Sequence, residues 1–203
     1  TDFRDESHDF VYGLPELQRE RIKSANRIAN PGCFATTIQL AILPLAHQKV
    51  IIDDIHVSAI TGSTGAGQAL SNTAHFSWRN NNVSIYKAFT HQHLKEIGQS
   101  IGSLQPDFDH SINFIPYRGN FTRGIMANVY TKFNGNLHSA IEIYQQYYLG
   151  HPFTFVSTQD IDLKMVVNTN KCILQIQKNG DNLLITSIID NLTKGASGQA
   201  VQN

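Results

Sequence analysis

The stretch CILQIQKNGDNLLITSIID, residues 172–190, decides the fold class of this chain. Residues 172–177 and 182–190 alternate apolar and polar side chains, which is typical of β-strands. The segment Lys178-Asn179-Gly180-Asp181 separates them, and Asn-Gly between two such runs is the strongest short-range signal of a β-hairpin. The stretch therefore predicts two antiparallel strands joined by a tight turn.

Upstream of this hairpin, apolar spacing predicts alternating strands and helices. We expect helices over residues 35–47, 93–104 and 137–148, and strands over residues 50–61, 83–88, 111–116, 125–133 and 153–157. Strands outnumber helices, and several links are of the hairpin type. The sequence therefore predicts an α+β fold with a mixed, mainly antiparallel sheet and helices packed on one face.

Composition narrows the functional classes. The 203 residues suffice for one large domain, and 16 basic residues balance 16 acidic ones, which gives no support for a nucleic-acid partner. Cys33 and Cys172 are too few for a disulfide framework, so we expect a cytoplasmic protein. No apolar run has the length of a membrane span, and no signal peptide opens the chain, so we expect no membrane partner.

Cys33 is the first candidate for chemistry. It follows the turn Asn30-Pro31-Gly32 and stands where the helix over residues 35–47 begins. A helix N-terminus stabilises a thiolate, and its free N–H groups can hold an oxyanion, so we expect a lowered thiol pKa and a nucleophile. A buried core cysteine is the alternative interpretation.

Other polar segments offer candidate partners for this cysteine. His91 and His93 precede a helix and suit acid–base work, while a metal pair or two surface histidines remain alternatives. Arg118 and Arg123 lie on a loop between two strands, where they could bind phosphate or carboxylate or could be solvated.

The small-residue segment at residues 62–67 reads G-x-x-G-x-G. This is not the dinucleotide fingerprint G-x-G-x-x-G, and no acidic residue follows at the fingerprint's spacing. The segment is therefore either a loop beside an active site or a surface turn.

Seven ordered motifs give the chain a resemblance to a known family. They are Tyr12-Gly13-Leu14-Pro15-Glu16, Asn30-Pro31-Gly32-Cys33, Gly62-Ser63-Thr64-Gly65-Ala66-Gly67, Tyr86-Lys87, His91-Gln92-His93, Arg123-Gly124 and Asp190-Asn191-Leu192-Thr193-Lys194-Gly195-Ala196. Together they are similar to the N-acyl-γ-glutamyl-phosphate reductases of arginine biosynthesis. Aspartate-semialdehyde and glyceraldehyde-3-phosphate dehydrogenases are more distant relatives.

The resemblance implies NADPH-dependent reduction of an acyl phosphate, with acetyl or succinyl as the acyl group, to a semialdehyde and phosphate. Cys33 would form a thioester, and His91 would be the acid–base residue. His93, Arg123, Gly65 and Gly67 would contact substrate. Gly195, Ala196 and Asn203 would border the NADP cofactor, and no metal is implied.

Two segments depart from the family pattern. Many relatives read H-R-H-T-P-E-I where this chain reads HQHLKEI over residues 91–97, and Arg118 has no secure counterpart.

The resemblance also implies a domain organisation. Residues 1–203 would be the catalytic and dimerisation domain, from a homodimer or homotetramer. The N-terminal dinucleotide-binding domain would be absent and the C-terminal helix truncated, because both ends, Thr1-Asp2-Phe3-Arg4 and residues 195–203, look cut. We would then expect the chain alone to be inactive and to bind NADP weakly. A cysteine-dependent hydrolase or acyltransferase and a non-catalytic interaction domain remain alternatives.

Overall fold

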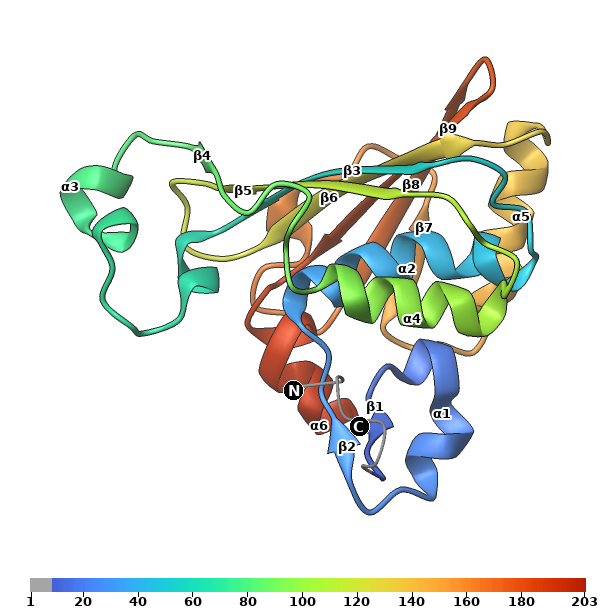
Figure 1. The fold of residues 1–203 in the computed structure, drawn as a ribbon, viewed down its shortest axis with the longest axis horizontal. Helices are drawn as coiled ribbons and strands as arrows, with labels where there is room; N and C mark the ends of the chain where they lie inside the picture. Colours follow the sequence, from blue (N-terminus) through green and yellow to red (C-terminus); the bar gives the residue numbers. More distant parts are fainter. Residues whose placement is uncertain (1–8) are drawn as a thin grey trace.

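The computed structural model describes residues 9–203, so the expectation for residues 1–4 lies outside the described part. Its main feature is a seven-stranded sheet in the order β4-β5-β3-β6-β9-β8-β7 (Figure 1). The strands are β3 (Ile55–Thr61), β4 (Ser84–Ile85), β5 (Ile112–Arg118), β6 (Ile125–Lys132), β7 (Thr154–Ser157), β8 (Cys172–Asn179) and β9 (Asn182–Ile189). The β3–β5 and β7–β8 pairs are parallel and the others are antiparallel, which confirms the predicted mixed sheet.

One helical layer covers the sheet. It consists of α2 (Cys33–His47), α4 (Leu94–Leu104) and α5 (Leu137–Tyr147), with α2 in the middle and in contact with both neighbours (Figure 1). Every residue of α2 from Phe34 to Ala46 is buried, the polar Thr36, Thr37 and Gln39 included, so this helix has no solvent-facing side. The helix is therefore the centre of the core and gives Cys33, at its first turn, a fixed position.

The predicted hairpin is present, with Asn179 paired to Asn182 and Gly180 at a positive φ of 56°. The predicted strand over residues 50–61 is shorter, because β3 begins at Ile55. The reason lies at Ile51, whose backbone N–H and C=O both bond to the side-chain amide of Gln105 instead of to a strand. The buried Gln105 side chain thus takes the place of a neighbouring strand as the hydrogen-bond partner of the Ile51 backbone.

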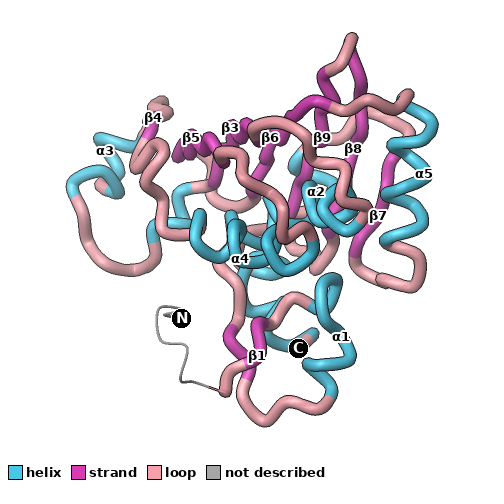
Figure 2. Tube along the Cα trace, turned by 45° about the vertical axis from the view of Figure 1, so that its right-hand side comes forward, coloured by secondary structure: helices cyan, strands magenta, loops and turns pink. Residues whose placement is uncertain are grey.

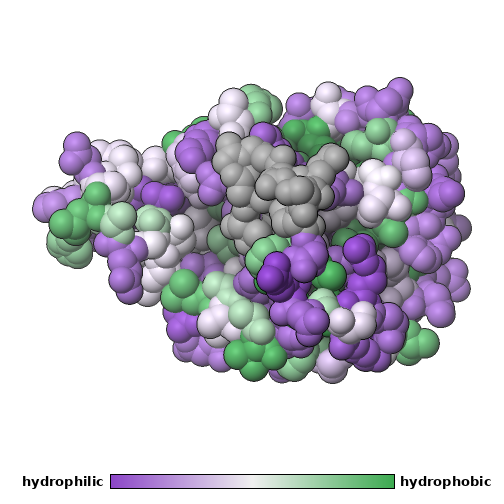
Figure 3. All heavy atoms as spheres, turned by 60° about the horizontal axis from the view of Figure 1, so that its bottom comes forward, coloured by the Kyte–Doolittle hydropathy of each residue, from purple (hydrophilic) through white to green (hydrophobic). Residues whose placement is uncertain are grey.

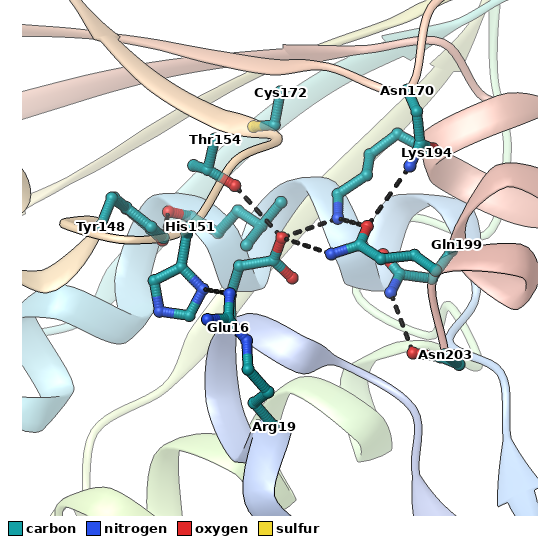
Figure 4. Close-up of polar contacts among 12 residues, drawn as sticks. Glu16, Arg19, Tyr148, His151, Thr154, Asn170, Cys172, Lys194, Gln199 and Asn203 are labelled. Atoms are coloured by element: carbon teal, nitrogen blue, oxygen red, sulfur yellow. Dashed lines mark hydrogen bonds and ion pairs between the residues drawn. The ribbon is translucent and has the colours of Figure 1, made fainter. Parts of the chain in front are cut away.

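A small second layer lies below the helices (Figure 2), and of its elements the sequence analysis expected only the truncated C-terminal helix. It contains β1 (Val11–Tyr12) paired with β2 (Ile28–Ala29), helix α1 (Pro15–Lys23), the π-helix Thr193–Ser197 and α6 (Gly198–Gln202). A buried ion pair between Glu16 and Lys194 joins its two ends (Figure 4). The beginning and the end of the described chain therefore meet directly below α2.

Residues 68–89 form a projecting segment at one end of the sheet. It carries the 3₁₀ turn Asn72–Ala74, helix α3 (Phe76–Arg79) and strand β4. The buried Arg79 side chain braces it through bonds to Thr73 O and Arg118 O. Leu70, Phe76 and Phe89 are exposed on it, and Figure 3 shows this segment standing out from the body with apolar side chains on its surface. Within residues 9–203, no helix is both long enough and apolar enough to span a bilayer.

Candidate active site

A cavity of about 640 Å³ opens at the N-terminus of α2. Its lining comes from the first turn of α2, the small-residue loop after β3, the projecting segment, the segment before α4, the end of β5 and the segment after β9. The lining residues are Cys33, Phe34, Thr61, Thr64, Gly65, Ala66, Gly67, Thr73, Tyr86, Lys87, His91, Gln92, His93, Arg118, Asn191, Leu192, Gly195 and Ala196. The structure therefore brings together eight of the ten residues singled out from the sequence, namely all except Arg123 and Asn203.

Cys33 is the first residue of α2, and Gly32 caps the helix with extended backbone. Burial is the largest influence on the thiol and raises its pKa to about 11, while hydrogen bonding from the backbone at Phe34 and Cys33 lowers it. The expectation of a lowered thiol pKa is therefore wrong for this state of the site, because desolvation outweighs the helix terminus. At neutral pH the resting group is a thiol.

His91 and His93 lie against each other, with ring centroids 4.6 Å apart. Phe34 packs edge-on against both rings. Burial lowers the pKa of each imidazole to about 4, so both are neutral at pH 7. The backbone N–H of His93 donates to Nδ1 of His91 at 3.3 Å, which leaves the ring proton of His91 on Nε2.

The turn before Cys33 is held by Glu96, a residue that the sequence analysis gave no role. Its Oε2 accepts the Gly32 N–H at 3.1 Å and the Tyr12 hydroxyl at 3.0 Å. A side chain at Gly32 would collide with the ring of His93. Glycine is therefore needed here for the close approach of the histidine, and Glu96 fixes the turn in that position.

Gly195 and Ala196 form the wall beside the thiol. A Cβ on Gly195 would lie 2.8 Å from the Cβ of Cys33, so only glycine allows this contact. Asn30 holds the segment by donating to the Ala196 carbonyl at 3.1 Å. Asn203 lies outside the lining, where its amide donates to Gly13 O and Asn30 Oδ1. Asn203 thus supports Asn30 rather than facing the cavity.

The glycine loop after β3 is a short 3₁₀ turn, Ser63–Ala66, and it does line the cavity. Gly67 ends it at a positive φ of 77°, with open space where a Cβ would stand. Asn191 Nδ2 donates to Thr64 Oγ1 and ties the loop to the segment after β9. The loop is therefore part of the site rather than a free surface turn.

Arg123 is not in the lining. Its guanidinium pairs with the buried carboxylate of Asp190, at 2.9 Å from Nε to Oδ2. Arg118, at the end of β5, faces the cavity instead. The expectation that Arg123 binds substrate therefore stays a prediction that the cavity lining does not support. The signal for Arg118 was strand alternation, since it shares a face with buried Phe114 and Pro116.

Comparisons with known proteins agree with this architecture. Residues 33–191 match the family described as "semialdehyde dehydrogenase, dimerisation domain", and the chain belongs to that family. It is similar over its whole length to the N-acetyl-gamma-glutamyl-phosphate reductase of Christiangramia forsetii, with 61% identity over 205 residues that cover 64% of the relative. It is also 61% identical to the enzyme of that name from Parabacteroides distasonis, over 97% of this chain and 61% of the relative. The resemblance drawn from the motifs is thus confirmed, although the chain spans less than two thirds of the length of these relatives.

Solved structures confirm the fold class. Aspartate semialdehyde dehydrogenase II from Vibrio cholerae has a TM-score of 0.72 at 16% identity, covering 97% of this chain and 68% of that chain. A probable aspartate-semialdehyde dehydrogenase from Pseudomonas aeruginosa has a TM-score of 0.71 at 12% identity, covering 98% and 68%. At such identities the likeness concerns the fold alone.

Proposed function

We propose that this chain is the cysteine-bearing part of an NADPH-dependent N-acyl-γ-glutamyl-phosphate reductase that acts in arginine biosynthesis. The observation that carries the proposal is the position of Cys33 at a helix N-terminus, in one cavity with two neutral histidines and Arg118. Identity of 61% to reductases of that name supports the choice of substrate class. An acyl phosphate is anionic and carries a good leaving group, which matches this set of side chains.

In the first step, the Cys33 sulfur would attack the acyl carbon, and the carbon–oxygen bond to phosphate would break. The thiol proton would leave with the phosphate, so the step balances without a lasting charge on the protein. The N–H groups of the first turn of α2 would stabilise the oxyanion. Nε2–H of His91 would donate a hydrogen bond to the oxygen where negative charge builds, and its low pKa fits this role because it keeps the ring neutral at pH 7.

In the second step the thioester becomes the aldehyde, and NADPH, when bound, would supply the hydride. The residues present fit a flat ring beside the thiol, because Gly195 and Ala196 offer no side chain larger than a methyl group on that wall. The thiolate released with the semialdehyde would take up one proton from solvent, and the high pKa of Cys33 favours this return to the thiol form. His93, Gly65 and Gly67 would contact the substrate, and Asn203 would act through Asn30.

We also propose that the dinucleotide-binding domain belongs to a part of the protein outside this sequence. Described residues 9–203 contain no strand followed by a G-x-G-x-x-G loop, and the relatives are longer than the chain. A homodimer or homotetramer is proposed from the family's description as a dimerisation domain. The exposed apolar side chains of the projecting segment support this assembly.

The test is an assay of the complete protein for NADP- and phosphate-dependent oxidation of N-acetyl- and N-succinyl-glutamate semialdehyde. Cys33→Ser should abolish the activity, whereas Cys172→Ser, which changes a buried cysteine outside the cavity, should retain it. Phosphate release from the acyl phosphate without NADPH, followed by rapid hydrolysis, would instead favour a cysteine-dependent hydrolase. Equal activity of Cys33→Ser and wild type would refute the proposal.

A further inference from the structure

Arg118 is a cation in the cavity without a carboxylate partner. Its side chain forms no ion pair with any residue in 9–203, and its Nε is buried without a hydrogen-bond partner there. The guanidinium carbon lies over the ring of Tyr86, 4.5 Å from its centroid, so the side chain packs against an aromatic face. A buried N–H donor such as the Arg118 Nε needs a hydrogen-bond acceptor, and the described lining of the cavity contains no carboxylate that could accept from it.

The residues that line the cavity carry a net positive charge. Its lining contains Arg118 and Lys87 but no Asp or Glu. Burial raises the pKa of Cys33 and lowers that of His91, and the negative charge of Glu96 behind the lining also raises the pKa of Cys33, whereas the positive charge of Arg118 lowers both pKa values. The guanidinium is therefore close enough to act electrostatically on both groups that the proposed chemistry uses.

Arg123, unlike Arg118, has a carboxylate partner among the described residues. Asp190 neutralises Arg123 and is itself fully buried, with the Asn168 and Leu192 N–H groups bonded to its oxygens. Arg123 is thus part of a closed internal network. Arg118 ends β5 and Arg123 lies on the loop that follows, and of these two arginines only Arg118 has its charge available to a ligand.

We propose that Arg118 binds an anionic oxygen group of the substrate, a phosphate or a carboxylate, and so sets which acyl phosphates the site accepts. This inference rests on the proposed function for the identity of the substrate. A guanidinium presents a planar fork of N–H donors that matches two oxygens of either group. Stacking on Tyr86 orients this fork before the ligand arrives, so less side-chain entropy is lost on binding.

Cys33 provides a readout that does not depend on reductase activity. Iodoacetate is an anion and iodoacetamide is neutral, so the ratio of their alkylation rates at Cys33 measures the local positive charge. In the complete protein, Arg118→Met should lower this ratio about tenfold, which corresponds to about 1.4 kcal/mol. Arg118→Lys keeps the positive charge, so the ratio of the two alkylation rates should stay close to that of the wild type. Arg27→Met, which removes an exposed arginine paired with Asp9, is the matched control and should leave the ratio unchanged.

Protection experiments identify the anion. Inorganic phosphate, acetate and succinate are each added to the wild-type protein while iodoacetamide labels Cys33. Protection by phosphate that is lost in Arg118→Met assigns Arg118 to the phosphoryl group, and protection by a carboxylate assigns it to an acid group of the substrate. Activity with N-acetyl and N-succinyl semialdehydes then shows whether Arg118 changes KM for only one of them.

The outcomes separate the two proposals. An unchanged reagent ratio in Arg118→Met, or no protection of the wild-type protein by any of the anions, overturns the anion site. If Arg118→Met does not fold, Arg118→Lys and the wild-type protection series decide the question. A lost anion effect in a protein that oxidises neither semialdehyde would keep the anion site and refute the reductase.

Discussion

The buried pair of Glu16 and Lys194 yields the most demanding prediction. The Lys194 Nζ lies 2.7 Å from Glu16 Oε1, and both side chains have no exposed surface. Thr154 also donates to Glu16, and Figure 4 shows the carboxylate between Thr154 on one side and Lys194 on the other. Since Lys194 directly precedes Gly195, the pair also fixes the wall beside Cys33. We predict that Lys194→Met destabilises the protein strongly.

The magnitude follows from the geometry. At 2.7 Å and an effective dielectric constant of about 20, the Coulomb attraction is about 6 kcal/mol. Desolvation offsets part of it, and loss of one partner from a buried pair costs about 3–5 kcal/mol. The double variant Glu16→Gln/Lys194→Met leaves no uncompensated charge, so we expect it to recover at least half of that loss.

The pH dependence has a definite sign. Burial is the largest influence on the Glu16 carboxyl and raises its pKa, but the charge and hydrogen bond of Lys194, together with hydrogen bonds from the Glu16 backbone and Gln202, bring the pKa below its usual value of 4.5. In the wild type this stabilisation is therefore complete above about pH 4.5 and is lost as the pH falls through the lowered pKa. In Lys194→Met the attraction of the ammonium is lost while burial, the largest influence, remains, so we expect the carboxyl pKa to rise above its usual value. The variant should therefore lose stability as the pH rises above about 4.5, and its deficit should be larger at about pH 8 than at about pH 5.

Urea unfolding of the complete protein, followed by far-UV circular dichroism, measures these differences. Lys23→Met is the matched control, because it breaks an exposed pair with Glu20 and should change little. A loss below about 1 kcal/mol in Lys194→Met would refute the reasoning. A double variant that is no more stable than Lys194→Met would refute it as well.

Three further predictions concern Cys33 and the glycines. Because burial raises the pKa of Cys33 to about 11, the rate of its alkylation by iodoacetamide should keep rising with pH beyond about 9, and a plateau near pH 7 would contradict this. Gly195→Ala places a Cβ against Cys33 and should lower activity at least tenfold, about 1.4 kcal/mol, whereas Gly102→Ala, which meets nothing within 4 Å, should retain activity in the same assay. Gly32→Ala should displace the ring of His93 and reduce both activity and stability, and wild-type kinetics with an unchanged urea midpoint would show that this contact is dispensable.

Sequence patterns predicted the elements that are defined by local periodicity. The hairpin turn at Gly180 and helix α4, expected from His93 and observed from Leu94, are correct to within a residue or two. Helix α1 was missed because it is short and polar, with three buried residues and no apolar stripe. The start of β3 was misplaced because a long-range bond from Gln105 decides it, and no local pattern encodes such a contact.

The site was predictable where a residue's role follows from its immediate neighbours. Cys33 after Pro-Gly indicated a helix N-terminus, and the structure has it there. The choice between Arg118 and Arg123 depends on Asp190, which lies on a distant strand end, so the loop sequence alone could not make it. The prediction of a lowered thiol pKa was wrong for a similar reason, since desolvation of the thiol depends on all the residues packed around the first turn of α2.

Polar contacts add to the core packing of α2 and set the position of Cys33 from two sides. Glu96 fixes the Gly32 turn on one side, and the Lys194–Glu16 pair fixes the approach of Gly195 on the other. Apolar contacts tolerate small slips between elements, whereas a buried hydrogen bond or ion pair is lost if its partners separate by an ångström. Both glycine contacts leave no room for a side chain, so a slip of either segment would either crowd the thiol or expose it. We therefore expect variants of Glu96 and Lys194 to change the reactivity of Cys33 by more than their effect on global stability alone would require.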